Sequence, residues 1–167
     1  MDVTIKNNEF RIKGRTGVLY SKLNGVLIET IDGSSSKELF GAGEYEVSGI
    51  SVIGVQVEGN EIIFVYEVDG LRICNLNNLT KKLADSKISA VGDIDILLLP
   101  IASENIERMQ QLESYYVIPF NYKTEEDLNK FLKESGLTVQ KMPKLSLKKE
   151  EIIEESPTTI VVLDSSR

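Results

Sequence analysis

Histidine is absent from this 167-residue chain, and Cys74 is its only cysteine. Histidine is the commonest metal ligand in proteins and the commonest general base near neutral pH. The chain therefore lacks the residues for a zinc site built from histidine and cysteine. The absence of histidine does not exclude a Mg²⁺ or Mn²⁺ site built from carboxylate and carbonyl oxygens. A single cysteine also excludes an intramolecular disulfide, which fits a reducing compartment.

Excess positive charge and long hydrophobic runs are also missing. The formal net charge is −7, from 19 Lys and Arg against 26 Asp and Glu, which argues against binding of nucleic acid and of anionic lipid. The longest apolar runs, such as 96–99, are far too short to span a bilayer, and no secretory signal opens the chain. The composition is that of an ordinary globular protein. We therefore expect one cytoplasmic domain spanning residues 1–167, with no nucleic-acid and no membrane partner.

Short apolar runs separated by turn residues fill the first part of the chain and predict β-strands. Glu9–Lys13 alternates polar and apolar residues strictly, as a half-buried strand does. Val18–Tyr20 and Val26–Ile31 flank Asn24-Gly25, a dipeptide that favours a two-residue hairpin turn. Asp32–Ser36 predicts an ordinary surface turn, because it lacks the Gly-Lys-Ser ending and the following long helix of a phosphate-binding loop.

The central part of the chain, Glu46–Gly70, is a meander of strands punctuated by glycines. Asp69-Gly70 predicts a tight turn that pairs a strand at Ile62–Val68 with a strand at Leu71–Cys74. Ile94–Leu99 is apolar at nearly every position, which predicts a central strand covered on both faces.

Helical patterns follow in the second half of the chain. Thr80–Ala84 predicts a short helix that Ile88–Val91 extends, and Ser103 is a candidate N-cap for a second helix. A third helix begins with Thr124–Asp127, a variant of the capping box, and ends at Gly136.

Further strands alternate with these helices. Tyr115–Pro119 predicts a strand after the second helix, so the strand–helix–strand order implies a right-handed parallel crossover. Leu137–Val139 and Thr159–Leu163 predict the last strands, and the charged stretch Lys141–Glu155 between them predicts a solvated face or edge. A meander that gives way to strands with helical crossovers predicts a layered α+β or α/β fold.

A resemblance to known proteins rests on segments in the same order along the chain: Gly41–Val47, Asp69-Gly70, Asn75–Leu79, Ile94–Pro100 and Ile118–Tyr122. They resemble motifs of the metallo-β-lactamase fold superfamily, in a branch of small proteins proposed to be metal-dependent hydrolases. Those motifs read Gly-Pro-Gly-Glu-Tyr-Glu-Val, a strand ending in Asp-Gly, His-Leu-Gly-Asp-Leu, Val-Asp-(apolar)-Leu-Leu-Pro and Ile-Pro-(apolar)-His-Tyr. The resemblance implies a truncated metallo-β-lactamase-like β-sandwich with helices on the outside.

The metal-binding positions of these motifs hold asparagine in this chain. Asn75 stands where the branch has the ligand histidine of its loop, Asn78 at the metal-bridging aspartate and Asn121 at the last histidine. The His-x-His-x-Asp-His signature of the superfamily has no counterpart in residues 18–40. The resemblance therefore implies a degenerate member with no metal, no cofactor and no catalytic residue, in which Asn75, Asn78 and Asn121 mark a vestigial pocket.

Asparagine at these positions has two interpretations. Its side chain has nearly the shape of aspartate, but the amide is neutral and contributes no charge to hold Zn²⁺. A set of amides would line a polar, uncharged pocket, which suits a small-molecule sensor. We favour the other interpretation, in which Asn75, Asn77, Asn78 and Asn121 are turn residues that tolerate left-handed conformations.

Carboxylates offer an alternative chemistry. Glu44, Asp69 and Asp95 are candidates to line a ligand site, either as an oxygen-only metal site or as metal-free acid and base. This alternative requires that they converge beside Asn75 and Asn121. For Glu44 we favour a solvated strand face, and for Asp95 a hydrogen-bonded position at the start of a strand.

The sequence leaves three hypotheses of function. The first is a non-catalytic binding or assembly module, whose partner is an unknown protein or a second copy paired through open sheet edges. The second is a hydrolase that uses the carboxylates named above, and the third is a sensor with a cavity at the asparagine loops. Cys74 would be a reactive thiol only with a lowered pKa, and we expect it to be buried instead.

Overall fold

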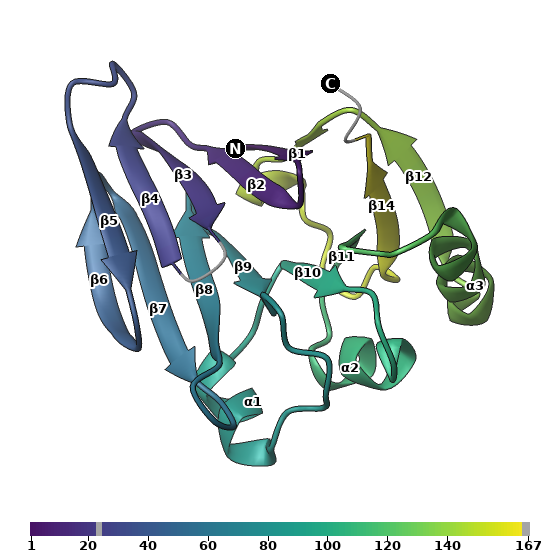
Figure 1. Ribbon diagram of the computed structural model, residues 1–167. Coiled ribbons are helices and arrows are strands. Elements are labelled where there is room, and N and C mark those ends of the chain that lie inside the picture. Colours follow the sequence, from purple (N-terminus) through teal and green to yellow (C-terminus); the bar gives the residue numbers. More distant parts are fainter. Residues whose placement is uncertain (23–24, 165–167) are drawn as a thin grey trace.

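A computed structural model describes residues 1–22 and 25–164 of the protein. These residues form two stacked β-sheets, and three α-helices pack against one of the sheets (Figure 1). The second sheet is covered on one face by the first sheet and on the other face by the helices. The arrangement agrees with the predicted layered α+β fold.

The first sheet has the strand order β13-β1-β2-β3-β4-β5, and its strands are antiparallel. Its strands are β1 (Asp2–Lys6), β2 (Glu9–Lys13), β3 (Gly17–Lys22), β4 (Gly25–Thr30), β5 (Ser36–Phe40) and β13 (Leu145–Ser146). The strand predicted from its alternation is β2, and the predicted hairpin strands are the paired β3 and β4. Asn24, the first residue of the predicted turn between them, lies outside the described residues.

The second sheet has the strand order β12-β14-β11-β10-β9-β8-β7-β6. Its strands are β6 (Gly43–Val47), β7 (Ile50–Gln56), β8 (Ile62–Val68), β9 (Leu71–Asn75), β10 (Ile96–Pro100), β11 (Tyr116–Phe120), β12 (Thr138–Met142) and β14 (Thr159–Leu163). Strands β6 to β9 are antiparallel, whereas β9, β10, β11, β14 and β12 run parallel, which confirms that the predicted crossover joins parallel strands. Asp69 and Gly70 connect β8 to β9 with φ angles of 53° and 79°, as the predicted tight turn requires.

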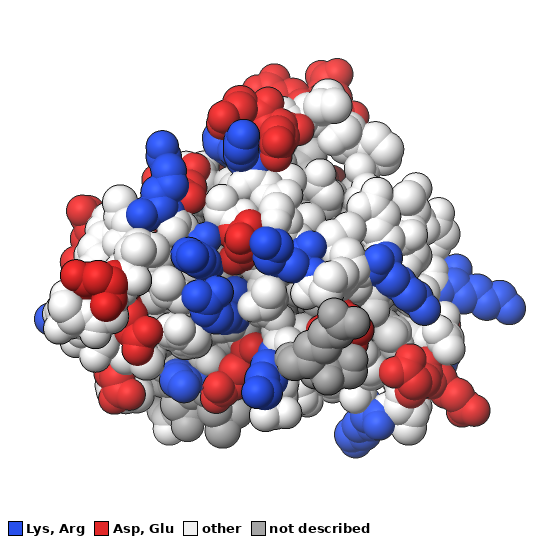
Figure 2. Space-filling model, turned by 90° about the horizontal axis from the view of Figure 1, so that it is seen from above, with Lys and Arg blue, Asp and Glu red and all other residues white. Residues whose placement is uncertain are grey.

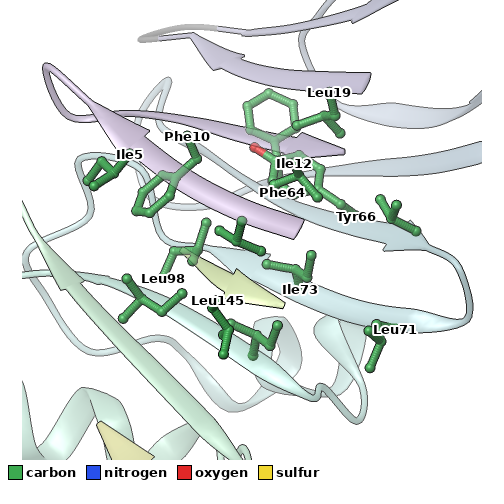
Figure 3. Packing of buried hydrophobic residues seen from close by; sticks show 14 of the residues in the cluster. Ile5, Phe10, Ile12, Leu19, Phe64, Tyr66, Leu71, Ile73, Leu98 and Leu145 are labelled. Atoms are coloured by element: carbon green, nitrogen blue, oxygen red, sulfur yellow. The ribbon is translucent and has the colours of Figure 1, made fainter. Parts of the chain in front are cut away.

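The layering produces two hydrophobic cores. The core between the sheets is formed by inward side chains from both, including Phe10 and Leu19 from the first sheet and Phe64 and Leu98 from the second (Figure 3). Phe10 meets Phe120 edge to face, with ring centroids 5.0 Å apart. The other core lies between the second sheet and the helices. Burial on both faces explains why β10 is a continuous apolar run.

The helices are α1 (Asp85–Val91), α2 (Asn105–Gln111) and α3 (Glu125–Ser135). The capping box that predicts α3 is present, since the Thr124 hydroxyl accepts from the Asp127 amide at 3.1 Å and the Asp127 carboxylate accepts from the Thr124 amide at 3.1 Å. Gly136 ends α3 with a φ of 62°. None of the described helices is long and apolar enough to cross a membrane.

The prediction of a helix at Thr80–Ala84 is wrong, because α1 begins only at Asp85. The Leu83 amide donates to Gln111 Oε1 at 2.9 Å, and Gln111 Nε2 donates back to the Leu83 carbonyl oxygen at 2.9 Å. The backbone here is thus satisfied by a side chain of α2 rather than by a helical turn of its own.

Ser103 does not cap α2. Glu104 occupies the N-cap position in a left-handed conformation, with a φ of 53°, and makes no side-chain cap. The Asn105 side chain instead exchanges hydrogen bonds with the amide and carbonyl of Ala102, at 2.9 and 3.0 Å. The Asn105 side chain, inside the helix, thus holds the backbone that leads into α2. The capping pattern of the sequence does not predict this role.

The charged stretch Lys141–Glu155 is not simply a solvated face. Leu145 and Leu147 within it are buried in the core between the sheets, and β13 pairs with β1 so that Leu145 lies opposite Val3. A short 3₁₀ turn follows at Lys149–Glu151. The two leucines, spaced two apart among charged residues, are the mark of an edge strand.

Candidate functional site

Asn75 ends β9 at the carboxyl edge of the parallel strands, and its side chain is 2% exposed. Asn75 Nδ2 donates to the Tyr66 hydroxyl oxygen at 3.2 Å, while Asn75 Oδ1 accepts from the Asn77 amide at 2.9 Å. Burial raises the pKa of the Tyr66 phenol, so this hydroxyl stays protonated. Both ends of the Asn75 side-chain amide are therefore engaged in hydrogen bonds inside the protein.

The loop after β9 is held from within as well. Asn77 has a φ of 58°, and its Nδ2 donates to the Ile62 carbonyl oxygen at 3.2 Å. Leu76 and Leu79 are buried on either side, and the Leu79 amide donates to the Leu76 carbonyl oxygen at 2.9 Å. Asn78 is exposed at the tip of this turn. Asn77 thus fits the interpretation as a left-handed turn residue.

Asn121 follows β11 and is exposed, with a φ of 53°. The backbone amide of Asn121 donates to Asn8 Oδ1 at 3.1 Å, and the side-chain nitrogen Nδ2 of Asn8 donates to Asn121 Oδ1 at 3.4 Å. Asn8 belongs to the turn between β1 and β2 and also has a positive φ, of 61°. This pair of asparagines ties a loop of the second sheet to a turn of the first.

Arg108, a buried arginine that the motifs do not indicate, lies close to the loop after β9. Arg108 of α2 is 1% exposed, its Nη1 donates to the Leu79 carbonyl oxygen at 2.8 Å, and its Nη2 donates to the Pro100 carbonyl oxygen and to Asn105 Oδ1 at 2.7 Å each. Burial lowers the pKa of the guanidinium, and nearby Glu104 opposes this shift. The cation thus joins the loop after β9 to the end of β10.

The signal for Arg108 in the sequence is only its spacing. Arg108 lies four residues before Leu112, so the two share one helix face, and Leu112 is buried. A charged residue at a core-facing position of a helix predicts an internal hydrogen-bond partner. Which carbonyls it meets depends on contacts between distant segments.

Asp69 and Asp95 lie at the opposite end of the strands from Asn75. Asp69, in the β8–β9 turn, accepts from the Arg15 amide at 3.0 Å and pairs with the N-terminal ammonium at 3.4 Å. Asp95 is buried, accepts from the Arg72 amide at 2.8 Å and binds Lys149 Nζ at 2.9 Å. Asp95 therefore has the hydrogen-bonded position at a strand start that the sequence predicts.

Glu44 is exposed on β6, the edge strand of the second sheet, as expected for a solvated face. Glu44, Asp69 and Asp95 are thus not brought together, and they do not converge beside Asn75 and Asn121. Throughout residues 1–22 and 25–164, no group of three or more His, Cys, Asp and Glu side chains is placed to hold a metal ion.

Cys74 is fully buried, and burial raises the pKa of its thiol to about 12, with a smaller opposing effect of Arg72. A thiol in this state is not a nucleophile at neutral pH. The expectation of a packed, unreactive cysteine agrees with this environment.

None of five prominent surface cavities in the described part of the chain is lined by Asn75, Asn78 or Asn121. One of about 730 Å³ lies at the other end of the parallel strands, beside Asp95 and Lys149. The sensor hypothesis, which requires a cavity at the asparagine loops, finds no support in these positions.

Comparisons with known proteins agree with this architecture. A family model described as the β-lactamase superfamily domain matches residues 7–121. A Thermotoga maritima protein, described as a proposed Zn-dependent hydrolase of the metallo-β-lactamase superfamily, is 20% identical, with a TM-score of 0.77 over 98% of this chain and 100% of that one. A proposed metal-dependent hydrolase from Parabacteroides distasonis is 13% identical, with a TM-score of 0.43 over 77% of this chain and 94% of that one. No curated protein matches the chain. The chain therefore belongs to the β-lactamase superfamily domain family, and its fold is that of a metallo-β-lactamase-like protein.

Proposed function

We infer that the protein is a non-catalytic member of its family that serves as a binding or assembly module. The observation that carries this inference is the state of Asn75. Asn75, which by the resemblance of its motif stands at a ligand position, is buried and neutral, and both ends of its amide are engaged, with the Tyr66 hydroxyl and the Asn77 backbone. Its oxygen and nitrogen stabilise the loop, and they are not directed toward a ligand.

The chemistry of the donor set does not fit the Zn²⁺ that the family implies. Zinc in proteins is held by thiolate, imidazole and carboxylate groups. The three positions that the motifs match to metal ligands, Asn75, Asn78 and Asn121, carry neutral amides instead. Arg108 also puts a buried positive charge between the loop after β9 and the end of β10, against the Leu79 and Pro100 carbonyl oxygens. A second cation close to this guanidinium would be repelled in the poorly screened interior.

The alternative of a hydrolase built on carboxylates has less support. Asp69 and Asp95 are each neutralised by cations, the N-terminal ammonium and Lys149, at the far end of the strands. Glu44 stands apart on an exposed edge strand. A pair of acidic groups that act on one substrate must lie within reach of the same bond.

Metal content tests the proposal. The protein is produced untagged in medium with added zinc, manganese and iron, and its metal is measured by elemental mass spectrometry. We expect far less than one equivalent of any metal, both as purified and after loading with each metal followed by desalting. One equivalent that survives desalting would overturn the proposal. Turnover of ester or phosphodiester substrates by the desalted protein, above that of an Asp95→Asn and a Glu44→Gln variant, would overturn it as well.

A further inference from the structure

The outer face of the first sheet is not covered by any described helix. Phe10 and Ile12 of β2 are buried between the sheets, so the residues that alternate with them, such as Arg11, point to the other side. Figure 2 looks down on the side where β1 and β2 lie, and it shows several Lys and Arg side chains near the middle of that side, with Asp and Glu side chains between and around them. Charges of both signs thus lie on this side of the protein.

Strand register aligns the outward residues of this face in rows. The middle row consists of Thr4, Arg11, Tyr20, Leu27 and Glu38, each opposite the next on five neighbouring strands. The Arg11 guanidinium lies 6.0 Å from the centre of the Tyr20 ring, and its Nε donates to the Tyr20 hydroxyl oxygen at 3.4 Å. The row is therefore positive at one end, apolar in the middle and negative at the other end.

This order of charges is complementary to itself. We propose that the outer face of the first sheet binds a second copy of this chain, about a two-fold axis that runs along the strands between β3 and β4. Strand β2 then lies over the partner's β5, so Arg11 faces the partner's Glu38 and Tyr20 faces the partner's Leu27. The contact is isologous and closes at two copies.

The charges also favour this two-fold axis, which runs along the strands, over a two-fold axis that runs across them. An axis across the strands would place each strand over its own copy, with Arg11 against the partner's Arg11 and Glu38 against the partner's Glu38. Like charges set directly opposite each other disfavour an interface. Sheets that pack face to face with nearly aligned strands are a common arrangement, and the axis along the strands produces it.

Shape adds a second argument. Phe40, on the outward side of β5, is 62% exposed and shares a row with Glu9. A groove of about 440 Å³ is lined by Glu9, Arg11 and Tyr20, together with other residues of β1 and β2 and with Asn7, Pro143 and Asp164. The proposed axis brings the partner's Phe40 over Glu9, at this groove. Each copy therefore buries its exposed phenyl ring in the groove of the other copy.

Sedimentation velocity of the untagged chain over a range of concentrations tests the proposal. We expect a monomer–dimer equilibrium that salt weakens. Arg11→Glu and Glu38→Arg should each raise the dissociation constant about tenfold or more, because each change turns two symmetric attractions into repulsions. The double variant Arg11→Glu/Glu38→Arg should restore dimerisation, and Glu58→Arg, in the β7–β8 loop of the second sheet, should leave it unchanged.

A chain that stays monomeric at every concentration would overturn the proposal. So would a dimer that both single reversals leave intact, or a double variant that remains as weak as the single ones. Arg11→Glu also removes a contact with Tyr20 within the monomer, so circular dichroism of each variant is compared with that of the wild type. Glu38 is exposed on the edge strand β5, so we expect Glu38→Arg to leave the stability of the monomer unchanged. A change in dimerisation by this variant therefore reports on the interface. The proposal concerns assembly alone, so metal binding by the chain would leave it standing.

Discussion

Replacement of Arg108 by methionine should destabilise the fold more than any exposed charge change. The guanidinium is 1% exposed and donates to the Leu79 and Pro100 carbonyl oxygens and to Asn105 Oδ1. Methionine has a similar length, so the cavity left behind is small. Its thioether cannot donate a hydrogen bond, so the three acceptors lose this donor.

The size of the effect follows from these lost bonds. A buried acceptor that loses its donor costs about 1–3 kcal/mol. Part of this loss is recovered, because the buried cation no longer has to be desolvated. We expect Arg108→Met to lower the free energy of unfolding by about 3 kcal/mol, which corresponds to a fall of about 6–12 °C in Tm for a chain of this size.

Urea unfolding followed by circular dichroism measures this change. Lys130→Met is the matched control, since Lys130 is 76% exposed and pairs only loosely with Glu134, at 3.9 Å; it should change the free energy of unfolding by no more than about 0.5 kcal/mol. Arg108→Lys keeps the charge but not the planar fork that reaches both carbonyls, so we expect an intermediate loss. An Arg108→Met protein within about 1 kcal/mol of the wild type would refute the reasoning, because it would mean that these acceptors do not depend on the guanidinium.

Three further results are expected. Asn75→Ala should cost about 2 kcal/mol in urea unfolding, since two buried hydrogen bonds are lost; no change would mean that the loop is held by other contacts. Cys74 should not react with a thiol reagent at pH 8 in the native protein and should react fully in denaturant, because burial raises its pKa to about 12; rapid native labelling would contradict this. The Asp32 carboxyl should titrate in NMR near pH 2, because hydrogen bonds from the Ser34 hydroxyl and amide, and then from Thr30, lower its pKa to about 2. Its contribution to stability is present above its ordinary pKa of 3.8 and is lost as the pH falls toward 2; a midpoint near 3.8 would show that these bonds do not persist in solution.

Local patterns predict much of this fold because they involve neighbours in sequence. Alternation locates β2, the Asp69-Gly70 dipeptide locates the turn between β8 and β9, and the Thr124 capping box locates α3. Each of these signals depends on residues within a few positions of one another. The order of motifs also indicates the metallo-β-lactamase-like fold, which the match over residues 7–121 supports.

Features that depend on distant segments escape this reasoning. Leu145 and Leu147 lie in a stretch dominated by charge, and only the sheet they join explains their burial. Arg108 is one cation among 19, and its role appears only when the loop after β9 and the end of β10 are placed around it. The asparagines illustrate both cases: the left-handed Asn77 and Asn121 follow from residue type, whereas the Asn75–Tyr66 bond depends on how β8 pairs with β9.

The pairing of β13 with β1 has a consequence for synthesis and folding. Asp2 and Val3 lie opposite Ser146 and Leu145, so one edge of the first sheet is completed by residues more than 140 positions later in the chain. During translation this edge of β1 stays open until the ribosome has produced the chain as far as Ser146. Closing such a long loop is slow compared with forming the β2–β3 hairpin. The newly made chain thus passes through a stage in which the first sheet has an unpaired edge at β1.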